Sequence, residues 1–192
     1  MRFGIDLDGV LADFGEKVVT IGNQLWPGKF PPGYVPDNWD YEGHLTKEEW
    51  KEVWAVIKTT PYFWEDEIPM PGVTDLREGV RPDDEIFFIT ARARTVGEPP
   101  SVQSILWLHE QGLWPRAGYS HVIAVEDPKH KQDLFRALKL QFMLDDYAPT
   151  VEQLNQIEGM HVFLFDRPWN HYAAELPRVF SVSEYLNTIR KL

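Results

Sequence analysis

Two aspartates, Asp6 and Asp8, follow a short apolar run in the stretch FGIDLDGVLADF, residues 3–14. A second acidic pair, Asp145 and Asp146, ends the apolar stretch QFMLDD at 141–146. Carboxylates held this close repel each other, and burial strengthens the repulsion. If the pairs are buried together, a cation must lie between them. We expect Mg²⁺, because it prefers oxygen ligands and binds together with substrate phosphate groups.

Each acidic pair also has a simpler explanation. Asp6 and Asp8 taken alone could form a solvated turn, and Asp145 with Asp146 could be the acidic start of a helix. A calcium loop is excluded, because its sixth position needs Gly and its twelfth needs Glu, whereas these positions hold Leu11 and Lys17. The occurrence of polar residues at the ends of several predicted strands favours a site.

Apolar runs alternate with helical patterns along most of the chain. Such runs predict a parallel sheet with both faces covered, and therefore an α/β, doubly wound fold. The predicted strands are 2–5, 85–89, 121–125, 141–146 and 161–166, and the predicted helices are 13–26, 47–58, 73–79, 101–112, 131–139, 150–157 and 182–191. Ligands of open parallel sheets bind beyond the carboxyl ends of the strands. Thr90 follows the second predicted strand, so we expect it to join the two acidic pairs there.

One segment interrupts the alternation. Residues 27–42 and 59–72 are rich in proline and aromatic side chains, and they flank the helix 47–58. Thr46 and Glu49 form a capping-box pattern at the start of that helix. We therefore predict a mainly helical insertion at 27–70 and a core domain made of 1–26 and 71–192.

Composition excludes several classes of protein. The 192 residues are 43% hydrophobic and 14% aromatic, enough for a real core, and the formal charge of −11 disfavours a nucleic-acid surface. The absence of cysteine excludes disulfides and thiolate metal sites. No apolar run approaches the ~18 residues of a membrane span, and no leader pattern is present. We expect no membrane contact and a cytoplasmic location.

Four motifs resemble those of the haloacid dehalogenase-like superfamily of phosphatases. They are DLDGVLADF, FFITAR, FMLDD, and DPKHK with its two lysines. Within that superfamily, PYFWEDEIPMPGVTDLRE (61–78), FDRPWN (165–170) and Phe14 are similar to the 5′(3′)-deoxyribonucleotidases. Two features depart from the animal enzymes: Thr-Ala-Arg replaces Thr-Ser-Pro, and the lysine lies further from the acidic pair.

The resemblance implies phosphomonoester hydrolysis through an aspartyl-phosphate. Asp6 would be the nucleophile and Asp8 the general acid and base. The Mg²⁺ ion would be held by Asp6, by the backbone carbonyl of Asp8, and by Asp145 or Asp146. A neighbouring acid and partial desolvation would help to keep Asp8 protonated for the first step.

The resemblance also implies a phosphate-binding set. Thr90 and the adjacent backbone N–H groups, that of Ala91 included, would hold one phosphoryl oxygen. Lys131 or Lys129 would balance the charge, and we favour Lys131 because it opens a helix. Arg92 could add a phosphate contact, with a plain surface arginine as the equal alternative.

The insertion would then be a cap over the site. Most of its aromatic side chains would form a small core, and Trp50 and Trp54, four apart on one helix, are expected to pack there. The expected substrate pocket comprises Phe14, Trp39, Tyr41, Phe63 and Trp64.

The preferred hypothesis is a Mg²⁺-dependent 5′-nucleotidase for (deoxy)ribonucleoside monophosphates. The alternatives are a phosphatase for another small phosphorylated metabolite or for a polynucleotide 3′-phosphate, and a non-catalytic module that binds a phosphorylated ligand. We expect a small phosphorylated substrate as partner; a monomer and a homodimer both stay open.

Overall fold

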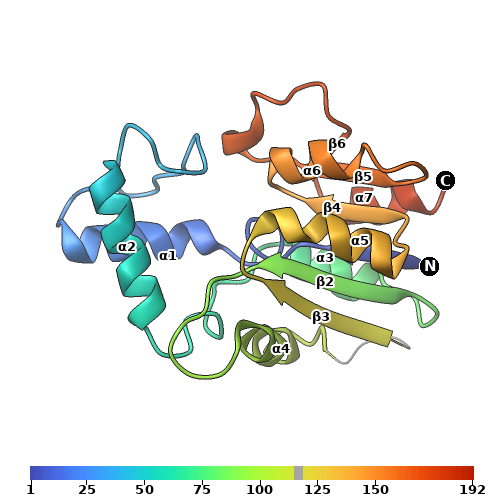
Figure 1. Ribbon diagram of the computed structural model, residues 1–192, viewed down its shortest axis with the longest axis horizontal. Helices are drawn as coiled ribbons and strands as arrows, with labels where there is room; N and C mark the ends of the chain where they lie inside the picture. The colour runs from blue at the N-terminus through green and yellow to red at the C-terminus, as the bar shows by residue number, and fades with distance from the viewer. Residues whose placement is uncertain (115–118) are drawn as a thin grey trace.

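A six-stranded parallel sheet forms the centre of the computed structural model, which describes residues 1–114 and 119–192 (Figure 1). The strand order is β3-β2-β1-β4-β5-β6. The strands are β1 (Arg2–Ile5), β2 (Glu85–Ala91), β3 (Tyr119–Val125), β4 (Phe142–Asp145), β5 (His161–Phe165) and β6 (Arg178–Val179). This confirms the predicted doubly wound α/β fold. The sequence analysis missed β6, because two residues are too few to show a period.

Helices bury both faces of the sheet. Alternate residues of β2 point to opposite faces, so that Ile86 and Phe88 belong to one apolar cluster and Phe87 and Ile89 to the other. The first cluster includes side chains of α3 (Gly72–Gly79), α4 (Pro100–Glu110) and α7 (Val182–Ile189). The second includes side chains of α5 (Lys131–Leu138) and α6 (Ala148–Leu154). Two short 3₁₀ helices, η1 (Pro128–His130) and η2 (Pro168–Asn170), lie in the connections.

A third apolar cluster lies away from the sheet, in the part of the molecule that holds α1 (Phe14–Leu25) and α2 (Lys47–Thr59) (Figure 1). It joins α1 to the inserted segment, since Val18 and Ile21 are clustered with Val53 and Ile57. The sequence analysis assigned α1 to the core domain; its buried side chains instead pack with the insertion. We call α1 and residues 27–70 together the cap.

The predicted capping box is present at the start of α2. The Thr46 hydroxyl oxygen accepts a hydrogen bond from the Glu49 backbone N–H at 3.1 Å, and the Glu49 carboxylate accepts one from the Thr46 N–H at 2.7 Å. These bonds satisfy backbone donors that an open helix end would leave unpaired.

The two segments that connect the cap to the sheet run side by side. The Asp13 N–H donates to the Ile68 carbonyl at 2.9 Å, and the Met70 N–H donates to the Leu11 carbonyl at 2.8 Å. Ala12 and Pro69 form an antiparallel bridge between these bonds. The outgoing and returning segments are therefore hydrogen-bonded to each other where they leave the sheet.

Across residues 1–114 and 119–192, none of the helices has both the length and the apolar character that a membrane crossing requires. The cytoplasmic location expected from the sequence stays a prediction.

Candidate active site

Three buried carboxylates meet at the carboxyl edge of the sheet. Asp6 directly follows β1 and Asp145 ends β4, and these strands are parallel neighbours in which Ile5 aligns with Leu144. Asp146 follows Asp145, and one oxygen atom from each of the three carboxylates lies within 4.8 Å of the others. Strand pairing thus brings together acids that are far apart in the sequence.

Lys131 partly balances this negative charge. Its Nζ lies 2.7 Å from Asp6 Oδ2 and 2.7 Å from Asp145 Oδ2, and the side chain is buried. Lys129 lies two residues earlier in η1, is exposed, and pairs with Asp127. Of the two candidate lysines, only Lys131 reaches the acidic cluster, because it lies on the buried face of α5. Lys129 lies in η1 and faces solvent.

Burial changes the acidity of the cluster. It raises the pKa of Asp6 to about 7, an increase that Lys131 opposes and the neighbouring acids reinforce. Burial also raises the pKa of Asp146 well above its ordinary value, and the charges of Asp145 and Asp6 add to that increase. One lysine does not neutralise three buried carboxylates, so the cluster can accept a further positive charge.

Asp146 supplies a second sign that a cation fits. Its Oδ2 accepts a hydrogen bond from Trp169 Nε1 at 2.9 Å, whereas its Oδ1 is buried and has no hydrogen-bond partner among the described residues. The chain comes close to this carboxylate at Gly9, whose φ is +74° and where a Cβ would lie 2.1 Å from Asp146 Oδ2. The oxygen-only donor set is the one that Mg²⁺ prefers. Trp169 was not predicted; it lies in the FDRPWN motif.

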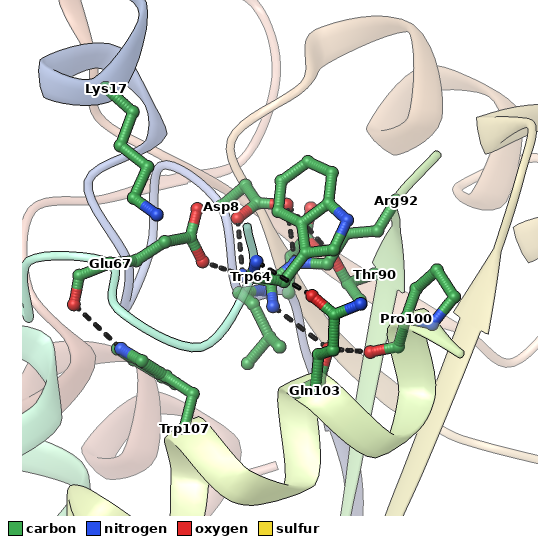
Figure 2. A network of polar contacts seen from close by, with 12 residues as sticks. Asp8, Lys17, Trp64, Glu67, Thr90, Arg92, Pro100, Gln103 and Trp107 are labelled. Atoms are coloured by element: carbon green, nitrogen blue, oxygen red, sulfur yellow. Dashed lines mark hydrogen bonds and ion pairs between the residues drawn. The ribbon is translucent and has the colours of Figure 1, made fainter. Parts of the chain in front are cut away.

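Asp8 lies in a different polar network, drawn in Figure 2. Arg92 holds both of its carboxylate oxygens, with Nη2 2.7 Å from Oδ1 and Nε 3.1 Å from Oδ2. The Thr90 hydroxyl donates to Asp8 Oδ2 at 3.2 Å. Asp8 therefore has acidic neighbours, Asp6 and Glu67, as expected, but a guanidinium group that was not expected there holds both of its oxygens.

This network changes the expected roles of two residues. The Arg92 side chain is fully buried and donates to Asp8, Glu67 and Ser104. It is not the surface arginine that the sequence suggested as one alternative, and the phosphate contact stays a prediction. Thr90 is also fully buried, so a phosphate contact from its hydroxyl would require it to turn away from Asp8.

A cavity of about 260 Å³ opens over the acids and continues under the cap. Its lining includes Asp6, Asp8, Ala91, Lys131 and Asp146 at the sheet edge, the acids Asp40 and Glu126, and the aromatic residues Phe14, Trp39, Trp54, Trp64 and Tyr147. Trp39 belongs to the irregular part of the cap and Trp54 to α2, and the ring centroid of Trp54 lies 5.9 Å from that of Phe14. The cavity thus joins a charged end to an aromatic one.

The expected pocket residues do not all reach this cavity. Phe14, Trp39 and Trp64 line it. Tyr41 and Phe63 are buried in the cap cluster instead, with Tyr41 against Trp50 and Phe63 against Trp64. Trp54 packs against the cap cluster and against Trp50, as expected, and it also lines the cavity, which was not expected.

Among solved structures, the fold is similar to that of haloacid dehalogenase-like proteins. A haloacid dehalogenase-like family hydrolase from Streptococcus pneumoniae aligns with a TM-score of 0.63 at 11% identity, covering 98% of this chain and 97% of the other. One from Xanthomonas campestris aligns with a TM-score of 0.58 at 13% identity, over 100% and 95%. At these identities the likeness concerns the fold.

Sequence comparison is more specific. A Bacillus cereus protein named "Putative nucleotidase" is 26% identical over 196 residues, which are 100% of this chain and 99% of the relative. The family model described as 5′ nucleotidase, deoxy (pyrimidine), cytosolic type C protein matches residues 1–192. The chain is a phosphatase of the 5′-nucleotidase type with the haloacid dehalogenase-like fold, and it belongs to the cytosolic type C 5′(deoxy)nucleotidase family.

Proposed function

We propose that the protein hydrolyses (deoxy)ribonucleoside 5′-monophosphates with the help of Mg²⁺, through a phosphoryl group carried by Asp6. One observation carries the proposal: Asp6, Lys131 and Asp146 line a cavity that is also lined by aromatic side chains of the cap, and Asp145 lies beside them in the acidic cluster. A phosphate group suits the charged end, and a base can stack on the aromatic walls.

Asp6, Asp145 and Asp146 are the side chains that would hold the metal ion. The unpartnered Asp146 oxygen and the raised pKa values of Asp6 and Asp146 support this assignment. When bound, Mg²⁺ would neutralise negative charge on the phosphoryl oxygens and on the acids themselves.

Asp6 and Asp8 divide the chemical work. An Asp6 carboxylate oxygen bonds to phosphorus while the ester P–O bond breaks, and Asp8 gives a proton to the leaving 5′ oxygen. Water then attacks the same phosphorus, the bond between phosphorus and the Asp6 oxygen breaks, and Asp8 takes the proton of that water. Inorganic phosphate leaves and Asp6 is restored.

Lys131 and the sheet edge would bind the phosphate. The Lys131 ammonium group would keep Asp6 in place and balance the charge of the phosphoryl oxygens. Ala91, part of the second motif, lines the cavity, and its backbone N–H would hold one oxygen. Cap aromatics that reach the cavity would exclude water while the phosphoryl group is transferred.

The test is phosphate release from a panel of deoxy- and ribonucleoside 5′- and 3′-monophosphates and simple sugar phosphates, with Mg²⁺ and with EDTA. Asp6→Asn is the nucleophile control, and we expect it to lower kcat for nucleotides by about 10⁴-fold or more. Release that requires Mg²⁺ and depends on Asp6 supports the proposal.

Two results would contradict it. Release from sugar phosphates alone would keep the chemistry and reject the nucleotide pocket. Full activity in EDTA or in Asp6→Asn would reject the metal or the nucleophile.

A further inference from the structure

Glu67 is a buried acid that lies outside the cavity and was not predicted from the sequence. Its Oε2 accepts a hydrogen bond from Arg92 Nη2, the same nitrogen that donates to Asp8 Oδ1 at 2.7 Å (Figure 2). The exposed fraction of Glu67 is 3% and that of Arg92 is 0%. Arg92 therefore lies between two carboxylates, one of which belongs to the active site.

The guanidinium group has little freedom in this place. Its Nη1 donates to Ser104 Oγ at 2.9 Å, and the Ser104 hydroxyl donates in turn to the Pro100 carbonyl at 2.7 Å. Its central carbon lies 4.8 Å from the Trp64 ring centroid. A planar guanidinium fixed on these sides presents two N–H groups to Asp8 in one orientation.

Glu67 links this arginine to the connection between cap and sheet. Its backbone carbonyl accepts a hydrogen bond from Trp107 Nε1 at 2.8 Å, and the next residue, Ile68, is bonded to Asp13 in the outgoing segment. Glu67 is thus anchored to α4 and to the cap connection at once, and its side chain reaches Arg92 from there.

Stability alone does not explain this arrangement. A buried ion pair gives little net stability compared with apolar groups of the same volume, because desolvation offsets the attraction. Instead, Glu67 and Arg92 fix the orientation of the Asp8 carboxyl group. That group must meet the leaving oxygen of the substrate.

We propose that Glu67 and Arg92 are positioning residues for Asp8: Glu67 holds Arg92, and Arg92 holds the Asp8 carboxyl group in line with the leaving oxygen. This inference rests on the proposed function, since it assigns Asp8 the acid–base role. The orientation of Asp8 would then depend on the segment that returns from the cap, because Glu67 lies in that segment.

Leaving groups of different basicity give the test. An alkoxide such as the 5′ oxygen of a nucleoside needs a proton as it departs, whereas 4-nitrophenolate departs with little help. The value of kcat/KM reports the steps up to and including the first bond cleavage, so it isolates the acid role. Glu67→Met fills the same space without an acceptor, and Arg92→Lys lacks the two-pronged donor.

We expect each variant to lower kcat/KM for a nucleoside 5′-monophosphate by about 10- to 100-fold, part of the general-acid contribution. Hydrolysis of 4-nitrophenyl phosphate should stay within about threefold of wild type. Glu67→Gln, which keeps an oxygen facing Arg92, should restore most of the nucleotide activity. Equal losses on both substrates, or no loss on either, would overturn the proposal.

A second measurement uses nucleotide alone. If Glu67 acts through Asp8, Glu67→Met should have no further effect on kcat/KM in an Asp8→Asn background, and a full additional loss would overturn the proposal. The matched control is Glu85→Gln, which removes an acid paired with Arg2 at the opposite end of β2. It should leave the ratio between the two substrates unchanged.

Failure of the proposed function would look different. Wild-type protein would then release no phosphate, or the wild type and the Asp6→Asn variant would release it at the same rate. A wild-type enzyme that needs Asp6 but shows the same substrate ratio in all Glu67 and Arg92 variants would reject only the positioning role.

Discussion

The sheet edge and the cap contribute different kinds of side chain to the site. At the sheet edge the functional groups are charged, buried and paired, and they come from distant parts of the chain: Asp6 and Lys131 are 125 residues apart. The cap contributes uncharged rings from one stretch, with Phe14 in contact with both Trp54 and Trp64. Chemistry thus depends on long-range packing, whereas the wall of the substrate pocket depends on a compact local cluster.

This difference predicts that substitutions at the sheet edge lower both the stability of the fold and the enzymatic activity. Lys131→Met should lower the free energy of unfolding of the metal-free protein by about 3–5 kcal/mol, because it leaves buried carboxylates without their cation. Urea unfolding in EDTA measures this effect, and nucleotide hydrolysis should also be lost.

Lys129→Met is the matched control, since Lys129 is exposed two residues away. Its unfolding free energy should stay within about 0.5 kcal/mol of wild type. Equal stability of the Lys131 and Lys129 variants would show that the acids do not need the lysine.

The acids should also make stability depend on pH. In the metal-free protein, burial raises the pKa of Asp6 from 3.8 to about 7, so the folded state keeps a proton that the unfolded state loses between these values. Stability therefore falls as pH rises through this window. Lowering the pH from 7 to 5 in EDTA should raise the free energy of unfolding by up to about 2.7 kcal/mol per such group.

Asp6→Asn should reduce this slope, and Mg²⁺ should reduce it in the wild-type protein. A slope unchanged by Asp6→Asn would mean that the protonation of other groups controls it. Denaturant titrations at pH 5, 6 and 7 are sufficient to decide.

Damage to the aromatic wall should affect binding more than chemistry. Trp54→Leu should raise KM for nucleotides by about 5- to 150-fold, the range that corresponds to one lost stacking contact, with a smaller change in kcat. Trp50→Leu is the control, since Trp50 does not line the cavity; it lies one turn earlier on α2 and packs against Tyr41 and against the Trp54 ring. If both substitutions raise KM equally, the increase does not come from a lost stacking contact with Trp54.

The smallest effect should come from the start of α2. Thr46→Ala removes the capping oxygen and should cost about 1 kcal/mol of stability, with nucleotide hydrolysis at 25 °C unchanged. A clear loss of activity would show that catalysis at the sheet edge depends on a well-ordered cap, although the cap and the sheet have separate apolar clusters.

Local patterns were enough to determine much of this protein. Apolar runs predicted five of the six strands, because a strand buried on both faces must be apolar along its length. The capping box at Thr46 and Glu49 was readable for the same reason: its bonds join residues three apart. Asp6 and Asp145 were found because strand ends in a parallel sheet share one edge.

Only the tertiary structure decided which neighbours these residues meet. The start of a predicted helix favoured Lys131 over Lys129, but only the packing of that helix shows that one lysine faces solvent and the other the acids. Arg92 turned inward because Asp8 and Glu67, 84 and 25 residues away, offer it buried carboxylates. Sequence patterns carry the preferences of single elements, while contacts between side chains depend on how those elements pack, and the roles of Arg92, Glu67 and Trp54 follow from that packing.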